Sequence, residues 1–417
     1  MSGLASPCLV HFSCPDPQQF DLATNAEIWS KADALTSSRG TSTKAAFERL
    51  QMVHGLTDSP SGLLWDVELR GHVKPADAIA FDAMRITVSS GVAQNEVGWL
   101  FSALKERGIT SKTVLDFCAR IDWRFCKALG SRAKLLQCLG TAREEAWKSS
   151  GVFKGGASEK LMVHPILMHF CDKVVRPRRI LLDHLSSFET IGSVLDLVRR
   201  GKAGELVHEQ LAADIKLHGL RCSVAYPAES MRPKNHYLHR LPKQLKRDTL
   251  IIDAFVGERK NGIIKRLSAG ILNASTFEKS AIVRVLGQQI DELSSPTVFQ
   301  DRLERPLRFD ALAALHGARS ASCAKCAVIG GTHLWADDAL VIDDSVHIIT
   351  AGCETDGKIW LATCRGHFVG HVTSTASRWT LEGESRLLDL GGEVPQMVEA
   401  WYRDPDGSLV ALYRQRS

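Results

Sequence analysis

Long hydrophobic runs are missing from this sequence. No stretch approaches the about 18 consecutive apolar residues that a membrane-spanning helix needs, so no membrane span is expected. The opening residues, MSGLASPCLVHFSCPDPQQF, lack the basic flank and long apolar segment of a secretion signal. Internal repeats of the length found in solenoids are missing as well. With 44% hydrophobic and 24% charged residues, the 417-residue chain is typical of a globular protein, and its length predicts two or three domains.

Several common catalytic signatures are also missing. The chain has no glycine-rich phosphate loop, no Gly-x-Ser-x-Gly elbow and no His-Glu-x-x-His motif. His164 and His169 lie in the apolar segment HPILMHF, which is more typical of core or surface histidines than of metal ligands.

Cysteine occurs 11 times, in a scattered pattern without a secretion signal, so mostly free thiols in a reducing compartment are expected. Cys323 and Cys326 have the spacing of metal ligands, and Cys353 and Cys364 could complete a set of four thiolates. Structural zinc sites usually combine two close pairs, whereas ten residues separate Cys353 from Cys364. The spacing therefore argues against zinc.

Positive charge is concentrated in one part of the chain. The whole sequence carries a formal charge of +5, but residues 221–266 hold eleven bases and four acids, a local surplus of +7. The rest of the protein is therefore slightly acidic. A basic patch on such a body favours a polyanionic partner, although a solvated helix face would explain the charge equally well.

The core of this basic region is RPKNHYLHRLPKQLKRDTLIIDAFVGERKNGIIKR, from Arg232 to Arg266. Pro233 suits a helix start, and Pro242 should divide the segment into two short helices. Leu238, Leu241 and Leu245 are expected on one face, with Arg240, Lys243 and Arg247 on the other. ERKNGIIKRL predicts a further helix with Glu258 in its first turn, where an acid favours the helix dipole for purely structural reasons.

A second acid follows an apolar run earlier in the chain. Residues 78–81, AIAF, predict a short buried strand that ends at Asp82. An acid at a strand end and a glutamate on a packed helix can together hold two divalent ions for phosphoryl chemistry. Asp82 and Glu258 are therefore expected to be neighbours in space.

These two stretches resemble the motifs of eukaryotic cut-and-paste DNA transposases. The matching residues of the late motif are Pro233, Lys234, His236, Tyr237, Leu238, His239, Glu258, Lys260 and Lys265, and those of the earlier motif are Asp82, Met84 and Gly91. The resemblance implies an RNase H-like core of the Asp-Asp-Glu type, with Asp82 and Glu258 as catalytic residues that bind Mg²⁺ if the site is active. It also implies DNA as the partner and the nucleus as the location, with the cytoplasm as the alternative. The expected nucleic-acid contacts are Arg232, Lys234, His236, Arg240, Lys243, Lys246, Arg247, Arg259, Lys260, Lys265 and Arg266.

The sequence departs from the transposase pattern in ways that affect catalysis. Arg85 and Asn261 stand where the pattern has histidines, and Asp16 is the sole weak candidate for the first catalytic aspartate. We therefore expect a chain truncated at the N-terminus relative to its parent, with a degenerate site. An active metal-dependent transposase or nuclease using Asp82 and Glu258 remains the alternative, as does a protein-interaction module that acts through the C-terminal region. A homo-oligomer is compatible with each reading.

The expected fold class is α+β, an incomplete RNase H-like core with a large helical insertion and a small antiparallel β domain. We assign residues 1–110 to the partial core, 111–230 to the insertion, 231–318 to the basic helical segment that completes the core, and 325–417 to the β domain. NEVGWLFSALKERG predicts a helix that stops at Gly108. Asp356-Gly357 and Asp406-Gly407 predict hairpin turns, and residues 317–324 predict a linker that makes the β domain separable.

Overall fold

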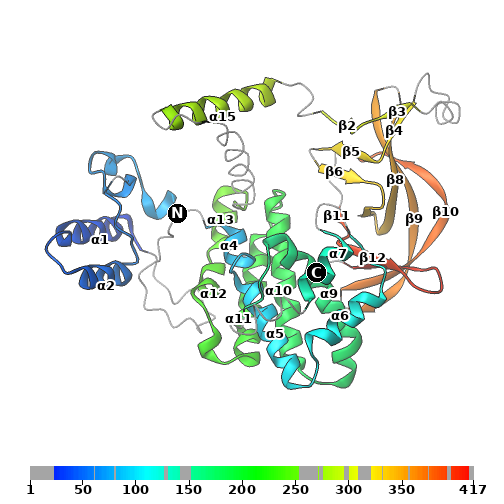
Figure 1. The fold of residues 1–417 in the computed structure, drawn as a ribbon, viewed down its shortest axis with the longest axis horizontal. Helices are drawn as coiled ribbons and strands as arrows, with labels where there is room; N and C mark the ends of the chain where they lie inside the picture. Colours follow the sequence, from blue (N-terminus) through cyan, green and yellow to red (C-terminus); the bar gives the residue numbers. More distant parts are fainter. Residues whose placement is uncertain are drawn as a thin grey trace.

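The computed structural model combines a helical body with a curled antiparallel sheet, which confirms the α+β class (Figure 1). The described residues are 23–60, 62–78, 81–125, 130–140, 152–252, 271, 276–294, 300–308, 321–330, 332–355, 357–373, 375–391 and 396–412. Among the described helices, none combines the length and the apolar character that crossing a bilayer requires.

The helices that the structure describes lie between residues 25 and 294. Those described are α1 (Asn25–Ser38), α2 (Lys44–His54), η2 (Leu63–Trp65), η3 (Glu68–Gly71), α3 (Pro75–Ala78), α4 (Ala83–Thr87), α5 (Val92–Glu106), α6 (Ser111–Arg120), α7 (Arg132–Leu139), α9 (Ala157–Phe170), η4 (Cys171–Val175), η5 (Arg176–Arg178), α10 (Leu182–Lys202), α11 (His208–Ala225), η6 (Ala228–Ser230), α12 (Pro233–Leu238), α13 (Leu241–Asp248) and α15 (Phe277–Ser294).

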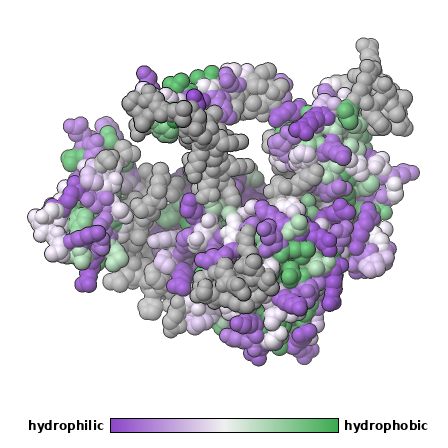
Figure 2. Space-filling model, viewed as in Figure 1, coloured by the Kyte–Doolittle hydropathy of each residue, from purple (hydrophilic) through white to green (hydrophobic). Residues whose placement is uncertain are grey.

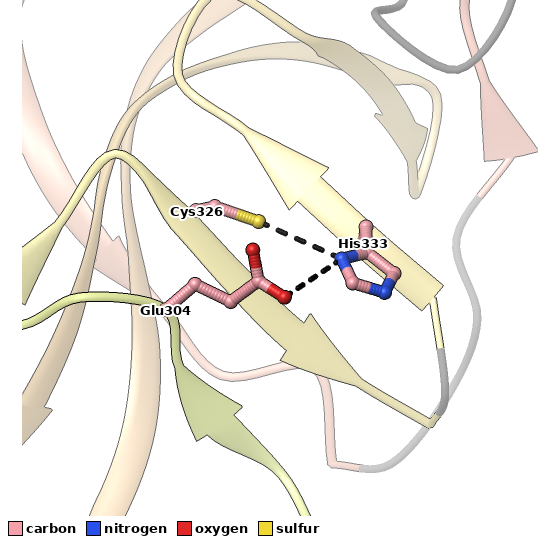
Figure 3. A group of neighbouring side chains, drawn as sticks. All are labelled: Glu304, Cys326 and His333. Carbon is pink, nitrogen blue, oxygen red and sulfur yellow. Dashed lines mark hydrogen bonds and ion pairs between the residues drawn. The ribbon is translucent and has the colours of Figure 1, made fainter. Parts of the chain in front are cut away.

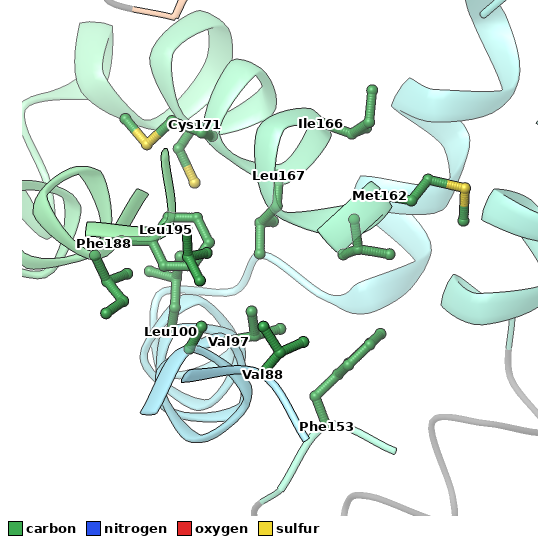
Figure 4. Close-up of a cluster of buried hydrophobic side chains, with 14 of the residues drawn as sticks. Val88, Val97, Leu100, Phe153, Met162, Ile166, Leu167, Cys171, Phe188 and Leu195 are labelled. Atoms are coloured by element: carbon green, nitrogen blue, oxygen red, sulfur yellow. The ribbon is translucent and has the colours of Figure 1, made fainter. Parts of the chain in front are cut away.

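The body is built around α5, α9 and α10, whose apolar residues recur at helical spacing. Figure 4 shows side chains of these helices meeting in one cluster, with Leu100, Leu167 and Leu195 pointing toward a common centre. The predicted helix at NEVGWLFSALKERG is confirmed as α5, and Gly108 follows it in a left-handed conformation with φ of 74°. Burial of these large aliphatic groups stabilises the body by roughly 1.5–3 kcal/mol per side chain.

The strands form one large and one small antiparallel sheet. They are β1 (Arg124–Phe125), β2 (Arg302–Leu303), β3 (Leu307–Arg308), β4 (Ala321–Ala324), β5 (Cys326–Ile329), β6 (Thr332–Trp335), β7 (Ala339–Ile342), β8 (Ser345–Thr355), β9 (Lys358–Thr373), β10 (Ala376–Leu388), β11 (Gln396–Met397), β12 (Ala400–Arg403) and β13 (Leu409–Leu412). The large sheet has the order β1-β12-β13-β10-β9-β8-β4-β3, with β7 also pairing β8 and β11 pairing β7. The small sheet has the order β2-β5-β6.

Both predicted hairpins are confirmed. The β8–β9 turn places Gly357 at φ of 78°, and the β12–β13 turn places Gly407 at φ of 82°, conformations that glycine adopts without steric cost. The two sheets pack on each other through a shared apolar cluster that includes Leu303, Ala327 and Ile349. Gly352 permits this approach, because a β-carbon there would lie 2.9 Å from the Ala327 side chain.

The sheet is not a unit that starts at residue 325. Strands β2, β3 and β4 precede that residue, and β4 occupies residues 321–324 of the predicted linker. From the predicted helical insertion, β1 pairs with β12 through Arg124 opposite Trp401 and Phe125 opposite Ala400. Strand pairing therefore extends across the predicted boundary.

The junction between body and sheet is aromatic and buried. Trp123 and Tyr402 have ring centroids 5.2 Å apart in an edge contact, and His169 lies 5.9 Å from each of them. Tyr402 belongs to the same apolar cluster as the helices of the body. An ion pair of 3.4 Å between Arg199 and the buried Glu399 adds a polar link.

Two elements lie apart from this junction. The N-terminal helices α1 and α2 enclose a small cluster of their own, which includes Ala32, Leu35 and Leu56. Helix α15 stands away from the body (Figures 1 and 2), and Ile282, Leu286 and Ile290 leave half or more of their surface exposed along it.

Candidate nucleic-acid interface

The basic segment forms two short helices, as predicted. Arg232 precedes α12, and the chain restarts at α13 with Pro242 in its first turn. Proline fits there because the first helical amides have no intrahelical acceptor and the ring already fixes φ. Leu238, Leu241 and Leu245 are buried on one side, which confirms the predicted apolar face.

The outward side of α13 carries Lys243, Lys246 and Arg247, all exposed. Arg247 also donates from Nε and Nη2 to the neighbouring Asp248, at 2.6 and 2.7 Å. This contact lowers the pKa of the Asp248 carboxyl, chiefly through the hydrogen bond from Arg247. We call Lys243, Lys246 and Arg247 the α13 basic face.

Two of the residues predicted to contact nucleic acid, Lys234 and His236, make contacts within the protein or are buried. Lys234 Nζ donates to the backbone carbonyls of Arg85, at 2.8 Å, and Ser89, at 3.2 Å, so it binds the last turn of α4. Burial, followed by the charge of Arg85, lowers the pKa of Lys234. His236 is buried, and this burial lowers its pKa to about 4. Lys234 is therefore held against the end of α4, whereas His236 is withdrawn from solvent.

The end of helix α10 packs against the buried side of α13. The amide of Ile251 donates to the carbonyl of Gly201, and a β-carbon at Gly201 would lie 3.0 Å from Cδ2 of Leu245. Arg200 and Lys202 lie in the same last turn of α10. Arg200 donates to Glu205 at 2.7 Å. Basic residues in the last turn of a helix interact favourably with the helix dipole, which accounts for both of them.

The predicted strand before Asp82 is wrong for the residues described. Ala78 belongs to helix α3, and Phe81 has no strand partner. Its backbone is satisfied by a side chain instead, since the Phe81 amide donates to Gln244 Oε1 at 2.6 Å and its carbonyl accepts from Gln244 Nε2 at 3.2 Å. Ile79 and Ala80 lie outside the described residues.

Asp82 itself begins helix α4. Its carboxylate accepts from the Arg85 amide at 3.3 Å and lies 3.4 Å from Nε of Arg85. Aspartate is a preferred N-cap because it accepts hydrogen bonds from amides that have no partner within the helix. Arg85, which stands where the transposase pattern has histidine, therefore pairs with the acid expected to bind metal.

The chain that leads to Glu258 passes beside Asp82. The amide of Ala83 donates to the carbonyl of Ile252 at 3.2 Å, although the predicted partner Glu258 lies outside the described residues. Asp16, Arg259, Lys260, Lys265 and Arg266 lie outside them too. Within the described part of the chain, the one close group of three metal-ligating side chains is Glu304, Cys326 and His333, so Asp82 has no such group around it there.

A buried acid that sequence reasoning missed lies inside the helical body. Glu96 of α5 accepts from Ser187 Oγ of α10 at 2.5 Å and lies 2.7 Å from Nε2 of His218 of α11. All three residues are almost fully buried. The Glu96 carboxylate therefore links three helices. Because it is buried and hydrogen-bonded within the protein, it is a structural group rather than part of a substrate site.

The four cysteines considered for zinc do not gather. Cys323 and Cys353 face each other across β4 and β8 with their sulfurs 3.5 Å apart. Cys364 lies opposite Ile348, further along β8, and its sulfur is 3.6 Å from Ser385 Oγ. Cys326 lies in the small sheet and approaches His333 instead. Comparisons of this chain with family models, with curated proteins and with solved structures found no match.

Proposed function

We propose that this protein is a transposase-derived, DNA-associated chain whose catalytic site is degenerate. The observation that carries the proposal is the α13 basic face, where three exposed cations stand on a helix anchored by buried leucines. Phosphate contacts from lysine and arginine supply most of the affinity of sequence-tolerant DNA binding.

The geometry around Asp82 supports the degenerate reading. A carboxylate that binds Mg²⁺ needs free lone pairs and further acids nearby. Asp82 instead caps α4 and pairs with Arg85, and the described residues provide no acid cluster around it. The active transposase or nuclease is therefore the less favoured alternative.

An incomplete RNase H-like core remains part of the proposal. Its support is the hydrogen bond from Ala83 to Ile252, which holds the chain six residues before Glu258 against the start of α4.

The test is DNA binding by the full chain, measured by fluorescence anisotropy across a range of salt concentrations. Changing Lys243, Lys246 and Arg247 together to alanine should weaken binding on unrelated sequences to a similar degree. If each cation contacts one phosphate, the slope of log K against log salt should flatten by about 2.7.

The matched control removes two lysines and one arginine elsewhere. Lys105, Lys112 and Arg120 are also exposed, on α5 and α6, and their change to alanine should leave the salt slope nearly unaltered. Equal losses in both variants would point to net charge alone, and an unaltered affinity in the α13 variant would refute the interface.

A further inference from the structure

The small sheet brings three metal-ligating side chains to one place. Glu304 follows β2, and its amide donates to the carbonyl of Cys326 in β5 at 2.9 Å. His333 lies in β6, where it pairs with Val328, two residues after Cys326. Because side chains alternate along a strand, Cys326 and His333 share the face opposite the one on which Ala327 and Leu334 enter the apolar cluster between the sheets.

A glycine turn sets this register. Ile329 pairs with Thr332, so two residues connect β5 to β6, and Gly330 adopts φ of 54°. Tight two-residue hairpins of this kind require glycine, and they leave the register no freedom to slip. Asp301 accepts from the Gly330 amide at 2.9 Å and ties the start of β2 to the same turn.

The ligand atoms are spaced for a metal ion. Nδ1 of His333 lies 3.3 Å from Oε1 of Glu304 and 4.0 Å from Sγ of Cys326, and all three ligand atoms lie within 4.8 Å of one another (Figure 3). A tetrahedral zinc site with ordinary bond lengths would place nitrogen and oxygen about 3.3 Å apart and nitrogen and sulfur about 3.6 Å apart. The nitrogen–oxygen distance therefore matches that of a zinc site, and the nitrogen–sulfur distance exceeds it by a few tenths of an ångström.

The surroundings suit the chemistry of zinc. Cysteine, histidine and glutamate are all common zinc ligands, whereas Mg²⁺ and Ca²⁺ prefer oxygen alone. The Cys326 side chain is buried, while His333 keeps 49% and Glu304 33% of its side-chain surface exposed. An ion bound there would be reached from solvent, and a water molecule could occupy the fourth position.

We propose that Glu304, Cys326 and His333 bind one Zn²⁺ ion, with water as the fourth ligand. The ion would join the two-residue strand β2 to the β5–β6 hairpin. This site involves other residues than the α13 basic face, so it does not depend on the proposed DNA binding.

The experiment titrates the full chain, freed of metal by dialysis against a chelator, with Zn²⁺ in a calorimeter and with Co²⁺ in an absorption spectrometer. One ion per chain is expected, and the Co²⁺ form should show thiolate-to-metal charge transfer with the intense visible bands of tetrahedral cobalt. Binding should weaken at lower pH, because the ligands must lose protons to coordinate.

The His333→Ala variant should weaken Zn²⁺ binding at least tenfold, because even changes next to a ligand typically cost 10–100-fold. It should still fold, since this side chain is half exposed. Cys326→Ser should remove the charge-transfer band, with circular dichroism used to check its folding.

Two variants serve as matched controls. His367 is an exposed histidine whose Nε2 lies 2.5 Å from Oε1 of Glu382, and it does not belong to the group of Glu304, Cys326 and His333. Cys364, whose sulfur lies near Ser385 Oγ, is also outside that group. His367→Ala and Cys364→Ser should bind Zn²⁺ as the unaltered protein does. No Zn²⁺ uptake, unaltered uptake by His333→Ala, or an equal loss in the controls would each overturn the proposal.

Discussion

The hydroxyl of Tyr402 lies 3.4 Å from Nε2 of His169, a contact that joins the last strands to helix α9 across 233 residues of sequence. His169 is buried, and burial followed by the charge of Lys173 lowers its pKa to about 4. A histidine that must stay neutral in the folded state makes stability depend on pH.

The pH dependence has a definite sign. Between the unfolded pKa of about 6.5 and the folded pKa of about 4, the unfolded chain binds more protons, so stability should fall as the pH drops through this window. The loss reaches about 3 kcal/mol at most for this group. Urea unfolding of His169→Gln at pH 7 and at pH 4.5 should show a smaller change than the unaltered protein, whereas His72→Ala, at an exposed position, should match the unaltered protein.

The network around Glu96 should be costly to break. Changing His218 to alanine leaves the buried Glu96 carboxylate without its imidazole partner, and losses of this kind typically destabilise by about 3–5 kcal/mol. Ser187→Ala should cost less, about 1–3 kcal/mol. The measurement is the free energy of unfolding in urea. As a comparison, His367→Ala removes an exposed pair with Glu382 and should cost no more than about 1 kcal/mol.

The role of Asp82 as a helix cap can be tested separately from any role in catalysis. Asp82→Ala should lower stability by about 1 kcal/mol, whereas Asp82→Asn should be nearly neutral because asparagine caps helices equally well. Neither variant should alter DNA binding, and the unaltered protein with Mg²⁺ should neither nick DNA nor transfer strands. Metal-dependent cleavage that disappears in Asp82→Asn and in Glu258→Gln would refute the degenerate reading.

The β region should not fold as an isolated fragment. Residues 325–417 alone lack β1 and β4 beside their sheet, and they leave Ala400, Tyr402 and Leu412 without the helices that cover them. We expect a broad, weakly cooperative thermal transition and binding of a hydrophobic dye. A sharp transition comparable with that of the full chain would show that the shared core contributes little.

Local signals in the sequence predicted local structure well. Proline placement predicted the break between α12 and α13, leucine spacing predicted their buried face, and Asp-Gly pairs predicted two hairpins. Each of these features depends on neighbours within a few residues. By contrast, the apolar run AIAF predicts a strand that Ala78 and Phe81 do not form, because periodicity alone does not identify so short an apolar segment as a strand.

The remaining errors concern partners far away in sequence. The sequence around Lys234 does not indicate that the carbonyls of Arg85 and Ser89 accept hydrogen bonds from it. Glu96 and His218 are 122 residues apart, and Glu304 and His333 belong to different strands, so neither pair forms a motif. The group of Glu304, Cys326 and His333 has one weak sequence signal, the spacing of Cys326 and His333 on either side of a Gly-Gly pair.

The pairing of β1 with β12 also bears on how the chain is made. A ribosome adds roughly 5–20 residues per second, so Ala400 leaves it on the order of 15–50 s after Phe125. During that time Tyr402 does not yet cover Trp123 and His169, so an apolar surface of the nascent helical body is exposed to solvent. The junction can therefore close only after Tyr402 has been added, and slowing translation before residue 400 should prolong any association of chaperones with the nascent chain.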